Sequence, residues 1–80
     1  MNDAEIMTIL TEVFRDVFDD DTLKIGPHMS AADIPEWDSF NHLNIVAASE
    51  IRFGIKFSVA EIERLANVGD FVRLIATKRA

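Results

Sequence analysis

The sequence is poor in several residue types, and each shortage excludes a class of protein. It has 80 residues and no cysteine, which excludes disulfide bonds, zinc–thiolate sites and a catalytic thiol within the chain. Its apolar runs are only a few residues long, so we expect no membrane insertion. Basic residues are scarce, with 8 Lys and Arg against 14 Asp and Glu, a formal net charge of −6. Because an acidic chain repels nucleic-acid phosphates and attracts basic protein surfaces, we expect protein partners and no nucleic acid.

The acidic residues are concentrated in the first half of the chain. Residues 1–38 contain ten acids and two bases, whereas residues 39–80 contain four acids and six bases. Any attraction to a basic partner therefore comes mainly from the first half. The opening residues are acidic and lack the basic stretch followed by an apolar stretch that typifies a secretory signal, so we expect a cytoplasmic protein.

The remaining composition is typical of a globular domain. The chain is 49% hydrophobic and 28% charged, which is too apolar for a disordered protein. A chain of this length forms one modest core and has no room for a deep catalytic cavity. We therefore expect a single domain over residues 1–80.

The first half contains one helical pattern followed by a long irregular stretch. Apolar residues spaced by four, three and four predict a helix over residues 3–18, and Asn2 with Glu5 forms a capping-box pattern at its start. Residues 19–38 have no sustained periodicity. A connection of this length is usually functional or disordered, and its apolar residues argue against disorder because they can anchor it to the core. These anchors are Leu23, Ile25, Met29, Ile34 and Trp37.

The second half contains three predicted helices. The first of them covers residues 39–53 and ends at Gly54, a typical C-cap. Its expected buried strip is Phe40, Leu43, Val46, Ala47 and Glu50. A capping box at Ser58 and Glu61 starts a short helix, and a last helix follows from about Val68. The expected fold is an all-α, four-helix bundle with a long first connection and a short third helix.

Ser39 is the most informative polar residue, since it lies where the long connection meets a helix. Helix N-termini have free amides and a partial positive charge that favour a phosphate group. A serine hydroxyl at that point is exposed and well placed to carry a phosphoryl group. The plainer interpretation is that Ser39 only caps the helix, and position alone favours it because capping serines are common.

Other polar residues give weaker signals. Asp38, Ser39 and His42 are the residue types of a hydrolase triad, but nothing in the chain suggests an orienting acid, an oxyanion hole or a substrate pocket. We expect His42 at the surface or boundary of its helix. The three aspartates at 19–21 lack the alternating ligand spacing of a calcium loop, so we expect a solvated acidic turn and no metal site. Trp37 and the six phenylalanines are interpreted as core and core-edge residues.

A resemblance to acyl carrier proteins is carried by residues 36–44, EWDSFNHLN. In that family an Asp-Ser-Leu sequence opens the second helix, and the other predicted elements fall in family order over nearly the whole chain. The resemblance implies that Ser39 carries a covalent 4′-phosphopantetheine donated by coenzyme A. It also implies that Asp38 and Phe40 are recognition residues for the phosphopantetheinyl transferase. The thiol that the chain lacks would then arrive on the arm.

The resemblance further implies a monomeric carrier that is not itself an enzyme. It would hold acyl or aminoacyl intermediates as thioesters and present them at high effective concentration to each partner. Implied partners are a loading ligase and an acyltransferase or synthase. The sequence departs from the family at Phe40, at Ser49 and in the nearly neutral stretch 50–52. These departures argue against the housekeeping fatty-acid synthase. Residues 37–44 look more like those of stand-alone carriers of specialised pathways, such as polyketide or peptide assembly and surface-polysaccharide modification.

Partner recognition is expected on the acidic connection rather than along the helix 39–53. Its acids nearest Ser39 are Asp33, Glu36 and Asp38. Two other interpretations remain open. The first is a non-catalytic helical interaction domain in which Ser39 is only an N-cap. The second is a helix-turn-helix DNA-binding protein, against which the acidic balance and the lack of clustered bases argue.

Overall fold

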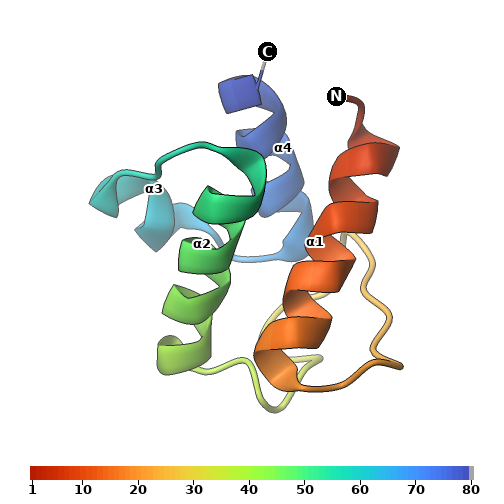
Figure 1. Cartoon of the computed structure of the whole chain (residues 1–80). Helices are drawn as coiled ribbons and strands as arrows, with labels where there is room; N and C mark the ends of the chain where they lie inside the picture. The colour runs from red at the N-terminus through yellow and green to blue at the C-terminus, as the bar shows by residue number, and fades with distance from the viewer. Residues whose placement is uncertain (80) are drawn as a thin grey trace.

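The computed structural model describes residues 1–79, and in this part of the chain it contains four helices and no extended strand (Figure 1). The helices are α1 (Asp3–Phe18), α2 (Ser39–Phe53), α3 (Val59–Arg64) and α4 (Val68–Arg79). The all-α fold, the long connection after α1 and the short third helix are confirmed. The bounds of α1 and α2 are those that the sequence predicts.

Local capping explains where the helices begin and end. The Asn2 carboxamide oxygen accepts from the Glu5 amide at 2.8 Å, and the Glu5 carboxylate accepts from the Asn2 amide at 3.1 Å. Ser58 and Glu61 form the same reciprocal pair at the start of α3. Gly54 ends α2 with a φ of 66°, a left-handed conformation that glycine adopts without a steric cost. The predicted capping boxes and the C-cap are therefore confirmed.

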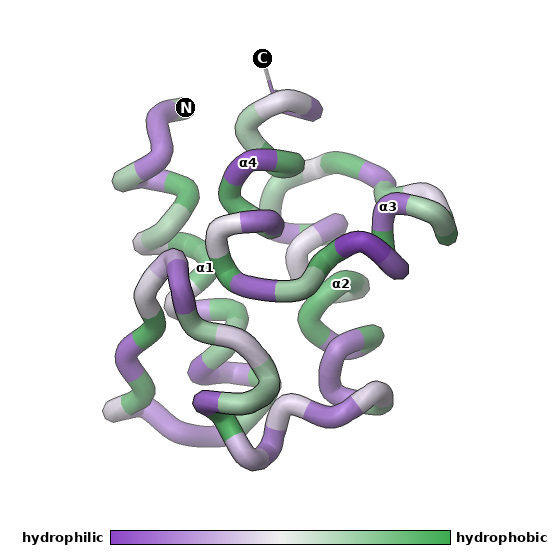
Figure 2. The backbone as a smooth tube through the Cα atoms, turned by 180° about the vertical axis from the view of Figure 1, so that it is seen from behind, coloured by the Kyte–Doolittle hydropathy of each residue, from purple (hydrophilic) through white to green (hydrophobic). Residues whose placement is uncertain are grey.

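The core lies where α1 packs against α2 and α4. Figure 2 shows hydrophobic and hydrophilic segments alternating along these helices, as expected for helices that bury one face. The buried residues of α1 are Ile6, Leu10, Val13 and Phe14. Those of α4 include Val68, Phe71, Val72 and Ile75, the stripe that its sequence indicates. No helix among residues 1–79 has the length and hydrophobicity that a membrane crossing requires.

The long connection is anchored to the start of α4 as well as to the core. Two of its predicted anchors, Ile34 and Trp37, are buried in the core. The other three are partly buried against the core. The Gly69 amide donates to the Pro27 carbonyl at 2.9 Å, and a Cβ at Gly69 would lie only 2.9 Å from that oxygen. Only glycine permits this approach. The buried anchors and the Gly69–Pro27 hydrogen bond together determine the path that the connection follows to α2.

The predicted buried strip of α2 is wrong at three positions. The helix buries Ile45, Val46, Ser49 and Phe53 and leaves Phe40, Leu43 and Ala47 exposed, with Glu50 half-buried. The expectation that Phe40 belongs to the core is wrong as well, because 73% of it is exposed. Apolar residues occur on several sides of α2, so its periodicity does not select one side. Packing against α1 makes that selection.

Candidate functional site

Ser39 is the first residue of α2, and it is exposed. The residue that caps the helix is Asp38, whose backbone is extended and whose carboxylate accepts from the Asn41 amide at 2.8 Å. The interpretation of Ser39 as the N-cap is therefore wrong. Because Asp38 caps the helix, the Ser39 hydroxyl has no capping role, and Ser39 lies at the surface.

The backbone before Ser39 is held to the first turn of α2 by two hydrogen bonds. The Asn41 carboxamide donates to the Glu36 carbonyl at 2.8 Å, and the His42 amide donates to the Asp38 carbonyl at 2.8 Å. The first turn of α2 contains no acidic residue. Asp38 satisfies one of the amides of this turn, so the amides that remain free make the helix terminus suitable for an anion attached to Ser39.

An open cleft of about 510 Å³ extends from Ser39 between the start of α2, α3 and the long connection. It is lined by Ala31, Trp37, Asp38, Ser39, His42, Leu43, Ile62, Glu63, Leu65 and Ala66. The sequence does not indicate the α3 side of this cleft, because the position of α3 depends on tertiary contacts and not on its own pattern.

Two of the cleft residues are joined by a hydrogen bond. The Trp37 indole Nε1 donates to His42 Nδ1 at 3.1 Å, and the two ring planes are inclined by only 18°, with centroids 6.1 Å apart. Because an indole N–H can only donate, His42 Nδ1 must be the acceptor, which leaves the ring proton on Nε2. His42 Nε2 lies 3.4 Å from the Ile62 carbonyl oxygen, so the imidazole links α2 to α3. His42 is half-buried, as its predicted boundary position requires.

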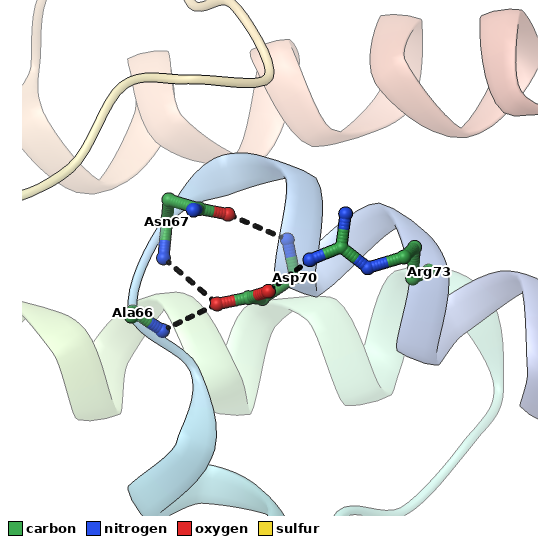
Figure 3. Close-up of polar contacts among 4 residues, drawn as sticks. All are labelled: Ala66, Asn67, Asp70 and Arg73. Atoms are coloured by element: carbon green, nitrogen blue, oxygen red, sulfur yellow. Dashed lines mark hydrogen bonds and ion pairs between the residues drawn. The ribbon is translucent and has the colours of Figure 1, made fainter.

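The far side of the cleft is fixed by a polar cluster at the start of α4 (Figure 3). The Asp70 carboxylate accepts from the Ala66 amide at 2.9 Å and from the Asn67 amide at 3.3 Å, and it pairs with Arg73. The Asn67 carboxamide accepts in return from the Asp70 amide at 2.8 Å. The hydrogen bond from Ala66, followed by that from Asn67, lowers the pKa of Asp70.

The remaining predicted recognition residues lie on the surface. Asp33, Glu36 and Phe40 are exposed, and the Asp33 carboxylate accepts from the Ser30 amide at 3.0 Å. Glu50 is half-buried and accepts from the Phe57 amide at 2.8 Å, so the one acid of α2 is engaged within the fold. The acids exposed near Ser39 are therefore those of the connection, together with Glu63 of α3, which lines the same cleft.

An exposed apolar face on α2 was missed by the sequence analysis. It consists of Phe40, Leu43 and Ile51, whose exposed fractions are 73%, 56% and 81%. The signal available in the sequence was Ile51, an apolar residue in the nearly neutral stretch 50–52. Phe40 borders Ser39, so this face, called the apolar face of α2 below, begins at the proposed modification site.

The acidic turn after α1 has an internal structural role. The Asp20 carboxylate accepts from the Thr22 hydroxyl at 2.8 Å and from the Thr22 amide at 3.0 Å, and these bonds lower its pKa. The neighbouring Asp19 and Asp21 are exposed, as a solvated turn requires. Among residues 1–79 no three metal-ligating side chains come together.

Comparisons with known proteins agree on one family. No family model matches the chain. An acyl carrier protein of Acidothermus cellulolyticus is 33% identical over 76 residues, which cover 95% of this chain and 90% of that protein. An acyl carrier protein of Thermosynechococcus vestitus is 30% identical over 80 residues, covering 100% of this chain and 99% of that protein. A solution NMR structure of holo acyl carrier protein from Geobacter metallireducens has a TM-score of 0.83 and 42% identity, over 90% of this chain and 83% of that one.

Proposed function

The chain belongs to the acyl carrier protein family, and we propose from this premise that it carries acyl or aminoacyl groups as thioesters on a 4′-phosphopantetheine arm attached to Ser39. The observation that carries the proposal is the exposed Ser39 hydroxyl at the start of α2, with the capping role taken by Asp38. When attached, the arm supplies the thiol that a chain without cysteine cannot provide.

The site fits the phosphate end of such an arm. The first turn of α2 offers the amides that Asp38 leaves free, so a phosphodiester on Ser39 meets the positive end of a helix beside the capping carboxylate. In the transfer, the Ser39 oxygen bonds to the phosphorus next to pantetheine in coenzyme A. The phosphoanhydride bond breaks, adenosine bisphosphate leaves, and a base of the transferase accepts the hydroxyl proton.

The chain serves as a carrier and not as an enzyme in this proposal. The imidazole that shares the cleft with Ser39 is that of His42, whose Nδ1 accepts from Trp37 while its Nε2 faces the Ile62 carbonyl. With both ring nitrogens engaged, His42 is not available as a general base for Ser39. The base that activates Ser39 therefore belongs to the transferase.

The proposed partners are the transferase, a loading ligase and an acyltransferase or synthase. Their contact surface combines the acids Asp33, Glu36 and Asp38 with the apolar face of α2, which begins at Phe40. The α2 surface lacks an exposed acid because Glu50 is engaged with Phe57. The lack of an exposed acid on α2 favours a specialised pathway over the housekeeping fatty-acid synthase. Such pathways include polyketide or peptide assembly and polysaccharide modification.

Mass spectrometry after incubation with a promiscuous phosphopantetheinyl transferase and coenzyme A tests the attachment. We expect the wild-type chain to gain the mass of one arm. Ser39→Ala should gain nothing, whereas Ser30→Ala, a matched change at another serine, should gain one arm like the wild type. A folded wild-type chain that gains no mass would sink the proposal.

A further inference from the structure

A groove of about 320 Å³ lies between α3 and α4, and Ser39 is not among the residues that line it. Its apolar surface consists of Leu65, which is buried, and Leu74, which is half-buried. Thr77 of α4 also lines the groove and is exposed. Leu65 reaches the cleft beside Ser39 as well, whereas the other lining residues belong to this groove alone. The carrier function proposed above therefore leaves the groove without a role.

The charges around the groove favour an acidic ligand. Asp70 pairs with Arg73, and the side chain of Asp70 is 24% exposed against 71% for that of Arg73. Glu61, whose side chain is 30% exposed, pairs with Lys78 of α4 at 2.9 Å. Arg64 is exposed and has no ion pair in the described part of the chain. Together these two acids and three bases give the groove a local charge of +1, although the chain as a whole carries −6.

The acids of the groove are also satisfied by backbone amides. Asp70 accepts from the amides of Ala66 and Asn67 (Figure 3), and Glu61 accepts from the Ser58 amide at 2.8 Å. The basic groups are less occupied, because a guanidinium has five N–H donors and Asp70 is bonded to only one nitrogen of Arg73. The groups left to meet a ligand are therefore mainly guanidinium donors, and carboxylates are their best partners.

We propose that this groove binds an acidic peptide segment of a partner protein. An apolar side chain of the segment contacts Leu65 and Leu74, and its carboxylates pair with Arg64 and Arg73. Because Ser39 does not line the groove, such a segment holds the carrier while Ser39 stays accessible to another enzyme. Tethering of this kind raises the effective concentration of the carrier at that enzyme without a new contact at the arm.

Two other occupants fit the groove less well. A second copy of the chain also has a net charge of −6, so the two copies repel each other. A nucleic acid meets the same repulsion, and two arginines are a smaller basic patch than its phosphates require.

Fluorescence polarisation tests the binding with a short dye-labelled peptide in which glutamates flank leucines. At low salt the full chain should bind this peptide at least about tenfold more tightly than a peptide in which lysines replace the glutamates. The net charge of the chain favours the lysine peptide, so a preference for that peptide would overturn the inference. A peptide of glutamate alone should bind more weakly, and equal binding would contradict the role of the two leucines.

Variants locate the charges that matter. Arg64→Gln and Arg73→Gln should each weaken binding of the glutamate–leucine peptide by about three- to fivefold, the effect of one exposed ion pair. Lys56→Gln removes an exposed lysine outside the groove and should change binding by less than about twofold. Because Arg73→Gln also removes the partner of Asp70, Thr77→Glu gives an independent test, since it adds a carboxylate to the groove and should weaken binding at least as much. Equal losses in Lys56→Gln and Arg64→Gln, or undiminished binding to Thr77→Glu, would contradict the groove as the site.

Amide resonances of the unmodified chain show where the peptide binds, so the outcome does not depend on whether Ser39 carries an arm. Titration should shift resonances within residues 61–77 and leave those of residues 39–44 in place. Shifts centred on residues 39–44 would place the peptide in the other cleft and overturn the inference. Sedimentation of the chain alone should show a monomer at the same concentrations, whereas self-association that Arg64→Gln abolishes would identify a second copy as the occupant and contradict the partner segment.

Discussion

At the scale of single residues, Ser49 is the position where the fold tolerates an unfavourable group. It is fully buried, and its hydroxyl has no hydrogen-bond partner among the described residues. A buried hydroxyl without a partner costs about 1–3 kcal/mol. The sequence marked this position only as a departure from the family that the chain resembles.

Ser49→Ala should therefore raise the free energy of unfolding by about 1 kcal/mol, because it removes the unsatisfied hydroxyl, and helix propensity acts in the same direction. Urea denaturation measures the change. Ser58→Ala is the matched control, since it removes the α3 N-cap and should lower the same free energy by about 1 kcal/mol. A Ser49→Ala chain less stable than the wild type would show that the hydroxyl has a partner in solution.

At the scale of elements, α3 is the helix that depends most on polar contacts. It has six residues, and no side chain within it is fully buried. The hydrogen bond from the Ser58 amide, followed by that from Lys78, lowers the pKa of Glu61 below its ordinary 4.5. Because the folded chain binds this proton less readily than the unfolded chain, the stabilisation is present above that value and is lost as the pH falls through the lowered pKa.

Glu61→Gln should consequently flatten the dependence of unfolding free energy on pH below the ordinary value of 4.5. Chemical denaturation at a series of acidic pH values measures this slope. Lys78→Gln should flatten it less, since the hydrogen bond from the Ser58 amide is the larger cause of the lowered pKa. Identical slopes in Glu61→Gln and the wild type would contradict this account of α3.

The elements also show how far the sequence determines the fold. Capping residues are local, so Asn2 and Gly54 allowed the start of α1 and the end of α2 to be predicted. The buried side of α2 is not local, because packing against α1 selects it from a helix with apolar residues on several sides. The link from His42 to Ile62 spans 20 residues and no periodicity connects its ends, so the α3 wall of the cleft was not predictable.

At the scale of the whole molecule, the net charge of −6 divides into an acidic first half and a slightly basic second half. Most of the exposed acids near Ser39 lie on the connection, with Glu63 of α3 beside them, whereas Glu50 is half-buried. A partner with basic residues should therefore contact the connection, while its apolar residues meet the apolar face of α2.

Neutralising Asp33, Glu36 and Asp38 together should raise the transferase KM by about tenfold, since exposed charge pairs contribute up to about 1 kcal/mol each. The changes are Asp33→Asn, Glu36→Gln and Asp38→Asn, which keep the oxygen acceptors used by the Ser30 and Asn41 amides. Glu50→Gln should change KM by less than about twofold, because Glu50 is half-buried and presents less of its charge to a partner. The opposite ranking of the two variants would refute the proposed surface.

The central claim is that Ser39 holds the arm, and peptide mapping of the transferase-treated wild-type chain by tandem mass spectrometry tests it most directly. The chain has serines at positions 30, 39, 49 and 58, and the arm is predicted on the peptide fragment that contains Ser39 alone. An arm mapped to any other residue, or a folded chain that carries no arm after treatment, would contradict the account.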